Sequence, residues 1–479
     1  MSAVEQLGER LRAAGFGGRP ASDVLAGHVI PPVDSLVALG RSDDALTAVL
    51  LKLFRKGHTI DRAQAERALA PVALDDLVDA CLMVIDGSRV RARLQLSQFG
   101  GLILAGDPTW DAEARSHVAP LTQSSGWVAH LTVRRKISAA LDLGTGSGIH
   151  ALFAARHAER VVGVDINAHA LAIARLSERL NPVANHIDWV EGNWIEVVHD
   201  RRFDLVVANP PWVISPDNAL LYRDDEAVRD EVSREVVRGC STALAEGGFA
   251  TVMCNWIHRE GQWDQPISEW VTGLGCDALL LHHASFKPLQ YALSWSTHLV
   301  DDPEVFDETV NRWASHYSRS GMERLATGFV ILRRRSSGSN WIQAFEGVGM
   351  PQGEGGEHIE RMFAAGDFLH SCTGARQLGE LLSRRWQLLK SHCLKQSAIY
   401  ADGAYVGEGR MSLQPDMGVD ATFDPRVLPV LLGCDGRRTL GEVIEETAIP
   451  ADLDRSGFHS LCLTSARHVI SRGYLVEAA

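Results

Sequence analysis

Apolar and polar positions divide the chain into three blocks, and the first block ends near residue 98. Apolar residues recur there at helical spacing over 43–57 and 61–70, and a third short helix follows. The dipeptide Asp86-Gly87 then predicts a tight turn between two short strands. The first block is therefore expected to form three short helices followed by a hairpin.

The second block, residues 99–335, alternates continuous apolar runs with segments of helical period. Five runs are expected to be strands: 138–144, 160–166, 187–193, 203–210 and 249–256. Apolar strands separated by helices indicate a parallel sheet that helices cover on both faces. Two later runs, 278–284 and 328–335, are expected to close this sheet as an antiparallel pair.

The third block, residues 336–479, opens with Ser- and Gly-rich sequence that is typical of a linker or surface loop. A helix is predicted over 376–392 and an extended segment over 399–409, followed by helix, turn, helix, helix and a short strand. The first block, residues 1–98, and this tail both resemble small winged-helix modules. The tail is also loosely similar to peptide-recognition domains found beside peptide-modifying enzymes. Three domains are predicted, with the sheet in the middle.

Composition and charge exclude some classes of protein. The chain has 479 residues, is 46% hydrophobic and carries a formal net charge of −13. It has enough apolar side chains for packed cores, and its acidic surface repels phosphate backbones, which argues against a protein that coats nucleic acid without sequence preference. The net charge does not exclude a local basic patch that binds one RNA or DNA element. The basic runs 134–136 and 333–335 are interpreted as solvated surface, with an RNA contact or a clamp between domains as the alternative.

The sequence predicts no membrane contact and no metal site. No window approaches 18 consecutive apolar residues, and the N-terminus lacks a basic segment followed by an apolar run. The eight cysteines are scattered, with no Cys-x-x-Cys pair. We therefore expect a cytoplasmic protein with reduced thiols. The sequence leaves its oligomeric state open.

The strongest local signal is a glycine-rich turn between the first expected strand and a helix. It contains Asp142, Gly144, Thr145, Gly146 and Gly148. Glycines let a ligand approach the backbone closely, but the third glycine stands one position too early for the dinucleotide pattern Gly-x-Gly-x-x-Gly. The acid two residues before the first glycine would repel a pyrophosphate and suits a ligand with an ammonium group. The turn resembles the S-adenosylmethionine motif of class I methyltransferases.

The next two strands support a nucleoside-containing ligand. Asp165 ends the second strand 21 residues after Gly144, where a carboxylate can accept hydrogen bonds from both ribose hydroxyls. Its neighbour Ile166 is included in the expected cofactor site. After the third strand, the resemblance implies that Asn193 accepts a hydrogen bond from the adenine amino group and that Trp194 packs on the ring.

The tetrapeptide Asn209-Pro210-Pro211-Trp212 follows the fourth strand. It matches the methyltransferase motif [ND]-P-P-[FYW], which marks methylation of planar amine or amide nitrogens. Such a nitrogen is a poor nucleophile because its lone pair is delocalised. The Asn209 side-chain oxygen and the Pro210 carbonyl can accept both N–H bonds of an NH₂ group and stabilise the developing charge. The prolines fix φ, and Trp212 offers an aromatic face to a planar target.

Together these motifs make residues 119–335 similar to the small-domain methyltransferases that include release-factor glutamine and ribosomal-RNA guanine enzymes. The continuation after Trp212 is closer to a bacterial subgroup with accessory domains at both ends. The resemblance implies an α/β fold, in which a Rossmann-like seven-stranded methyltransferase sheet is flanked by two winged-helix-like α+β modules. It also implies S-adenosylmethionine as cofactor, contacted by the glycine turn and by Asn209. Trp212, Tyr222 and Arg223 are expected to line the substrate entrance.

The sequence does not determine which molecule accepts the methyl group. The acidic charge and two interaction-type modules favour a nitrogen of a peptide or protein. A nucleobase amine in RNA or DNA is the main alternative, and a small-molecule amine is the third. A cofactor-binding scaffold without catalysis is the alternative from a different class. Segment 121–125 is expected either to fold over the methionine end of the cofactor or to be a polar connector.

Overall fold

The computed structural model describes residues 2–16, 42–108, 116–183, 185–193, 196, 199–216, 230–336, 338–371, 374–401, 404–413 and 418–478. The chain divides into two compact units, Met1–Asn340 and Trp341–Ala479. The N-terminal block and the large sheet both lie in the first unit. The three predicted domains, 1–98, 99–335 and 336–479, therefore stay a prediction.

Seven strands of the first unit lie in one large sheet in the order β11-β12-β10-β9-β6-β7-β8. Their bounds are β6 Ile137–Leu143, β7 Ala158–Asp165, β8 Ile187–Glu191, β9 Phe203–Ala208, β10 Leu244–His258, β11 Cys276–Phe286 and β12 Arg324–Arg334. The pairs from β8 to β10 are parallel, whereas β12 runs antiparallel to both β10 and β11. The predicted parallel sheet and its closing antiparallel pair are both present.

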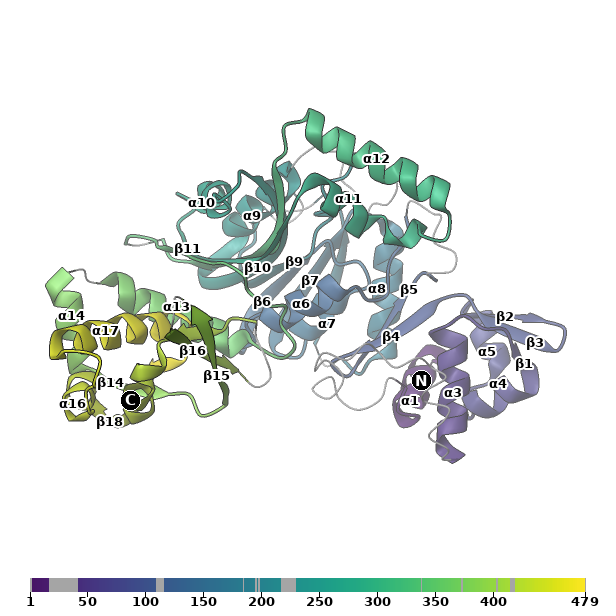
Figure 1. Ribbon diagram of the computed structural model, residues 1–479. Coiled ribbons are helices and arrows are strands. Elements are labelled where there is room, and N and C mark those ends of the chain that lie inside the picture. The colour runs from purple at the N-terminus through teal and green to yellow at the C-terminus, as the bar shows by residue number, and fades with distance from the viewer. Residues whose placement is uncertain are drawn as a thin grey trace. The chain divides into compact units, whose positions relative to one another are not determined.

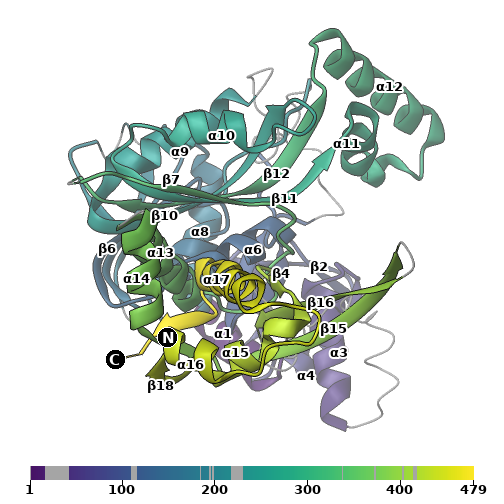
Figure 2. The same ribbon diagram turned by 60° about the vertical axis from the view of Figure 1, so that its left-hand side comes forward.

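Helices cover both faces of this sheet, as the apolar strands require. Figure 1 shows α6, α7 and α8 on one side and α9 and α10 on the other, and Figure 2 shows α6 and α8 opposite α9 and α10. Their bounds are α6 Gln123–Leu131, α7 Ile149–Ala154, α8 Ala168–Leu180, α9 Glu231–Ala243 and α10 Asp264–Val271. Helices α11 (Pro288–Trp295) and α12 (Pro303–Arg319) connect β11 to β12 and lie side by side at the edge of the unit.

The N-terminal block contains the predicted helices and hairpin. The three predicted helices are α3 Ser42–Phe54, α4 Arg62–Leu69 and α5 Leu74–Asp79, and α1 Ala3–Ala13 is a further helix that the pattern does not predict. The strands are β1 Ile60–Asp61, β2 Met83–Asp86 and β3 Arg89–Ala92, and the turn between β2 and β3 contains Gly87 at φ +58°. This block shares one apolar core with α8. It therefore packs directly against a helix that follows a strand of the large sheet.

A second hairpin, β4 (Gln95–Phe99) and β5 (Leu102–Gly106), joins the N-terminal block to the sheet layer. The edge of β5 that does not pair with β4 is bonded by a side chain of α8 and by Asn181, the residue directly after α8. Asn181 accepts from the Ile103 amide at 2.9 Å, and the Ser177 hydroxyl accepts from the Ala105 amide at 2.9 Å. These bonds satisfy buried backbone groups that would otherwise lack partners, so they fix α8 in position.

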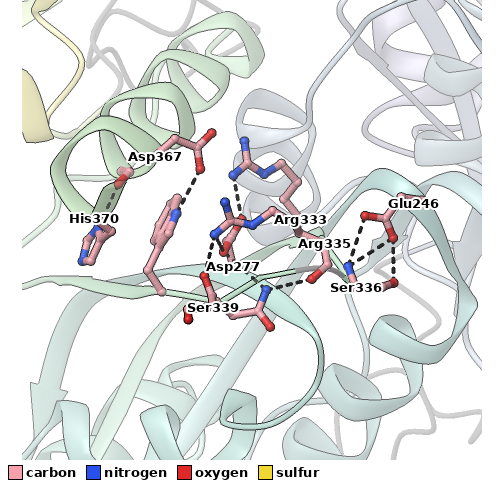
Figure 3. A network of polar contacts seen from close by, with 11 residues as sticks. Glu246, Asp277, Arg333, Arg335, Ser336, Ser339, Asp367 and His370 are labelled. Carbon is pink, nitrogen blue, oxygen red and sulfur yellow. Dashed lines mark hydrogen bonds and ion pairs between the residues drawn. The ribbon is translucent and has the colours of Figure 1, made fainter. Parts of the chain in front are cut away.

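A buried carboxylate on β11 forms ion pairs with arginines at the end of β12 (Figure 3). Asp277 on β11 is fully buried, and it pairs with Arg333 at 2.6 Å and with Arg335 at 2.7 Å. Arg334 donates instead to the Leu274 carbonyl at 2.9 Å. The arginine run interpreted as solvated surface is therefore bonded within its own unit. The reason is that a buried carboxylate is stable only when it is paired.

The second unit contains two small sheets, β18-β14-β19 and β15-β16-β17. Its strands are β13 Ile342–Phe345, β14 Arg385–Leu388, β15 His392–Ala401, β16 Ala404–Leu413, β17 Ala421–Phe423, β18 Asp435–Thr439 and β19 Leu475–Glu477. Its helices are α13 Gly356–Ser371, α14 Gly374–Ser383, α15 Leu428–Gly433, α16 Leu440–Glu446 and α17 Arg455–Ser471. The winged-helix interpretation of either end of the chain stays a prediction.

The predicted helix over 376–392 is wrong in its second half. Helix α14 ends at Ser383, and β14 begins at Arg385. The strand pairs with both β18 and β19 and buries Trp386, which is 3% exposed. Strand pairing and burial with segments far along the chain override the local helical period there. The predicted extended segment over 399–409 is confirmed as parts of β15 and β16.

Candidate active site

The glycine-rich turn begins directly after β6 and is organised around Asp142. This side chain is 1% exposed, and its Oδ2 accepts from the Thr145 hydroxyl at 2.5 Å and from the Ala151 amide at 2.9 Å. Gly144 and Gly146 have φ of +67° and +52°, and a Cβ added to either would have no atom within 4 Å. The two positions therefore combine left-handed backbone with open space, into which a ligand can approach the chain.

The second oxygen of Asp142 is the electrostatically unusual atom of this turn. Among the described residues, the buried Oδ1 has no hydrogen-bond partner. Burial raises the pKa of Asp142 to about 7, and the negative charge of Asp165 adds to this increase. A cationic group next to Oδ1 would favour the ionised form and supply the missing partner. This orphaned atom fits a ligand that carries an ammonium group.

Asp165 at the end of β7 joins the glycine turn to the start of α8. Its two carboxylate oxygens accept from the Gly146 and Asn167 amides, each at 2.9 Å. Burial is the main cause that raises the pKa of Asp165, while these amide bonds oppose the increase. Each oxygen keeps a lone pair, so the carboxylate can still accept from hydroxyls of a ligand. Ile166 beside it is an apolar side chain that is 64% exposed.

A tryptophan that belongs to none of the sequence motifs supports the same turn. Trp189 on β8 donates through its indole N–H to Glu178 at 2.7 Å. Its ring occupies the place where a Cβ of Gly163 would be, at 2.5 Å from the ring. The same ring lies 3.0 Å from where a Cβ of Gly148 would be. The small residues on β7 and in the turn are therefore needed for close packing against this ring.

Asn209 follows β9 and is held at both ends of its side-chain amide. Its Nδ2 donates to the hydroxyls of Ser124 and Ser125, each at 3.1 Å, and its Oδ1 accepts from the Trp212 indole N–H at 3.0 Å. The Trp212 ring meets Trp295 of α11 edge to face, with centroids 5.2 Å apart. The sequence segment 121–125 thus contacts the amide-containing motif directly.

Two buried tyrosines from α11 and α12 fix the chain just after this motif. The Tyr291 hydroxyl accepts from the Ile214 amide at 3.2 Å, and the Tyr317 hydroxyl donates to the Ile214 carbonyl at 2.6 Å. Both tyrosines are 0% exposed. The Asn255 amide suits its neighbours when its oxygen accepts from Tyr291 and its nitrogen donates to Thr327. The α11–α12 segment therefore builds one wall of the loop that follows Trp212.

The strand order brings most of the predicted site residues to one edge of the sheet. The glycine turn, Asp165, Asn193 and Asn209 follow β6, β7, β8 and β9, which are adjacent parallel strands. The carboxyl edge of such strands is where α/β proteins bind ligands. Three predicted residues, Trp194, Tyr222 and Arg223, lie outside the described residues. The predicted roles of all these residues stay predictions.

Several partners of the motif Asn209–Trp212 cannot be predicted from the sequence. Ser124 and Ser125 accept from Asn209, a contact that the sequence does not indicate, and the two roles expected for segment 121–125 stay predictions. No sequence motif indicates a role for Tyr291, Tyr317 or Trp189. Aromatic residues in apolar segments look like ordinary core in the sequence, and only their hydroxyl or N–H partners distinguish them.

Comparison with protein families shows that residues 123–259 match the family described as methyltransferase small domain. The release factor glutamine methyltransferase of Xylella fastidiosa is 36% identical over 132 residues, which are 26% of this chain and 46% of that enzyme. The bifunctional methyltransferase of Rickettsia typhi is 35% identical over 75 residues, which are 15% of this chain and 14% of that protein. The chain spans about half the length of the first of these relatives.

Solved structures also align with parts of the chain. One is the methyltransferase from Thiobacillus denitrificans in complex with S-adenosyl-L-homocysteine, which aligns with 46% of this chain and 95% of its own at 16% identity and a TM-score of 0.27. Another is Trm5b from Pyrococcus abyssi, which aligns with 52% of this chain and 62% of its own at 15% identity and a TM-score of 0.32.

Residues 123–259 are thus similar to the methyltransferase small-domain family. The chain therefore contains a methyltransferase domain of the S-adenosylmethionine-dependent class. The predicted class, cofactor and Rossmann-like α/β sheet are confirmed. Among the residues that the structure describes, no helix is both long and apolar enough to cross a bilayer.

Proposed function

We propose that this protein transfers the methyl group of S-adenosylmethionine to a planar, weakly nucleophilic nitrogen of a peptide or protein. The observation that carries the proposal is the fixed amide of Asn209. Both hydrogens of its Nδ2 are donated to serine hydroxyls, so only Oδ1 is left to meet an acceptor nitrogen. A group that only accepts hydrogen bonds suits the N–H groups of an amide or amine.

The residues of the glycine turn fit the cofactor. Asp142 would hold the ammonium group next to its orphaned Oδ1, and Asp165 would accept from the ribose hydroxyls. Gly144 and Gly146 would let the ligand approach the backbone. When bound, S-adenosylmethionine supplies an electrophilic methyl group on a sulfonium.

On the side of the site that would bind the methyl-accepting substrate, the protein offers oxygen atoms that accept hydrogen bonds. Asn209 Oδ1 and the Pro210 carbonyl would accept the two N–H bonds of an NH₂ group. These bonds orient the nitrogen lone pair and stabilise the positive charge that develops on the nitrogen. The Trp212 ring, which rests on Trp295, would lie beside the planar acceptor. The binding energy is thus used to position a poor nucleophile.

A peptide or protein acceptor is favoured over a nucleobase by two observations. The relatives include release factor glutamine methyltransferases, whose acceptor is an amide of a protein. The chain carries a net charge of −13, and Arg333 and Arg335, which belong to one of the basic runs, are paired with Asp277. Paired arginines offer less attraction to a phosphate backbone than free ones.

The test is transfer of a labelled methyl group into fractions of a bacterial cell extract. The protein is incubated with S-adenosylmethionine that carries a tritiated methyl group, and the product is digested with protease or with ribonuclease and deoxyribonuclease. We expect label that protease releases, and we expect Asn209→Ala to lose it while the Kd for S-adenosylmethionine changes less than about threefold. Label that only nucleases release, or equal transfer by Asn209→Ala, would contradict the proposal.

A further inference from the structure

The orientation of the Asn209 amide depends on one neighbour more than on the others. A side-chain amide can be rotated by half a turn with almost no change in shape, so hydrogen-bond partners decide which end is the oxygen. Serine hydroxyls both donate and accept, and Ser124 and Ser125 could therefore satisfy either end. The Trp212 indole N–H only donates. It is 3.0 Å from Oδ1, and it alone of these three partners requires an oxygen there.

We propose that Trp212 is a positioning residue that acts through its indole N–H, and that it makes Asn209 selective for nitrogens that carry hydrogen. The inference rests on the proposed function and deepens it by defining the acceptor. An indole N–H bonded to Oδ1 prevents the rotated state, in which Nδ2 would face another donor. The carbonyl end of Asn209 therefore stays on the side of Trp212.

The hydroxyls on the other side complete the arrangement. Thr122 caps helix α6, and its Oγ1 accepts from the Ser125 amide at 3.1 Å. The same oxygen lies 2.8 Å from the Ser124 hydroxyl and 2.7 Å from the Ser125 hydroxyl. Thr122 Oγ1 can accept from one serine hydroxyl and donate to the other, while each serine oxygen accepts one Nδ2 hydrogen of Asn209. The cap of α6 and the orientation of Asn209 therefore belong to one hydrogen-bonded cluster.

The hydrogen-bond donors and acceptors of the Asn209 side chain determine which substrate nitrogens it can bind. Asn209 has two hydrogens on Nδ2, and both are donated to serines. It has two lone pairs on Oδ1, and Trp212 uses one of them. One lone pair remains, so Asn209 can accept a single N–H and can donate nothing. An amide or amine nitrogen that carries hydrogen satisfies this site, whereas a ring nitrogen without hydrogen leaves the oxygen unpaired, which is costly in a partly buried site.

The position of the Trp212 ring has support that does not involve its N–H. The ring meets Trp295 edge to face, and it packs against the apolar cluster that includes Tyr291 and Tyr317. Trp212→Phe keeps an aromatic ring on this support and removes the N–H. This substitution therefore separates the proposed role of the N–H from the role of the aromatic face.

The first arm of the test reads the hydrogen bond itself by NMR. The full-length protein is labelled with ¹⁵N at the indole nitrogen of tryptophan, and the Trp212 signal is assigned by its loss in Trp212→Phe. We expect this N–H to exchange slowly with solvent, and we expect Asn209→Ala to shift it and speed its exchange. The Trp189 indole, which is bonded to Glu178, is the internal control and should not move. An unchanged Trp212 signal in Asn209→Ala would overturn the proposal.

The second arm reads catalysis with the methyl-accepting protein fraction from the labelling experiment. Trp212→Phe should lower kcat at least tenfold, with the Kd for S-adenosylmethionine within about twofold of the native value. Asn209→Asp supplies the rescue test, because either carboxylate oxygen can accept and orientation no longer matters. Adding Trp212→Phe to Asn209→Asp should therefore cost less than about threefold.

The outcomes of the two arms are distinguishable. If Trp212→Phe keeps kcat within twofold, or if it costs the same tenfold in the Asn209→Asp background, the positioning role is wrong. If the native protein transfers no methyl group to any fraction, the proposed function fails. The NMR arm then still decides whether Trp212 orients the Asn209 amide.

Discussion

The affinity for S-adenosylmethionine should depend on pH through Asp142. The carboxyl is buried and has a pKa of about 7, and an ammonium group binds best to its ionised form. About half of Asp142 is ionised at pH 7.0 and about 3% at pH 5.5, given this pKa. The Kd for S-adenosylmethionine should therefore increase about 15-fold when the pH is lowered from 7.0 to 5.5. An α-amino group stays protonated at both values, so the cofactor itself adds little change.

The assay is isothermal titration calorimetry of the native protein and Asp142→Asn at pH 5.5 and 7.0. Asp142→Asn should bind more weakly at pH 7.0 and should show little dependence on pH. The comparison isolates Asp142 from Asp165, whose pKa is also raised by burial. A native Kd that changes less than twofold, or an equal change in Asp142→Asn, would refute the assignment of Asp142 to the ammonium group.

The same carboxyl predicts a pH dependence of stability without cofactor. Folding raises the pKa of Asp142 from 3.8 to about 7, so the protonated form is favoured in the folded state. Its contribution to stability is complete below pH 4 and is lost as the pH rises through 7. The melting temperature of Asp142→Asn should therefore rise relative to the native protein between pH 4.5 and pH 7.5. A difference in melting temperature that does not change with pH would contradict the raised pKa.

Three further substitutions test other parts of the site. Tyr291→Phe leaves the Ile214 amide without its hydrogen-bond acceptor, which should cost about 1–3 kcal/mol of stability and lower kcat. Thermal denaturation and methyl transfer measure the two effects, and an unchanged melting temperature would contradict the contact. Gly163→Ala places a Cβ 2.5 Å from the Trp189 ring, so the ring must move, and calorimetry should show S-adenosylmethionine binding at least fivefold weaker rather than unaltered. Asp165→Ala should weaken the same binding at least tenfold, and an equal Kd would exclude the ribose contact.

The sheet could be predicted from the sequence because its strands are continuous apolar runs separated by amphipathic helices. The turn at Gly144 could be predicted as well, since glycines between a strand and a helix have few other uses. The end of α14 could not, because residues 385–388 form a strand only by pairing with β18 and β19. Local periodicity contains no information about partners that lie about 50 and 90 residues further along the chain.

The candidate site was predictable where chemistry resides in a motif, and not where it depends on a distant partner. Asn209 and Trp212 lie in one tetrapeptide, and their residue types alone suggest amide methylation. The bond between Asn209 and Ser124 joins residues 85 positions apart. The contact of Tyr317 with Ile214 spans 103 positions. The fold creates these pairs, so the orientation of the Asn209 amide becomes visible only in the structure.

The most direct test of the central claim is a calorimetric titration of the purified protein with S-adenosylmethionine, repeated with NAD. The acid and glycine pattern around Asp142 predicts binding of S-adenosylmethionine in the micromolar range and no detectable binding of NAD, whose pyrophosphate Asp142 would repel. Binding of NAD alone, or S-adenosylmethionine binding that survives unchanged in an Asp142→Ala, Asp165→Ala double variant, would contradict the assignment of this turn to the methyl donor.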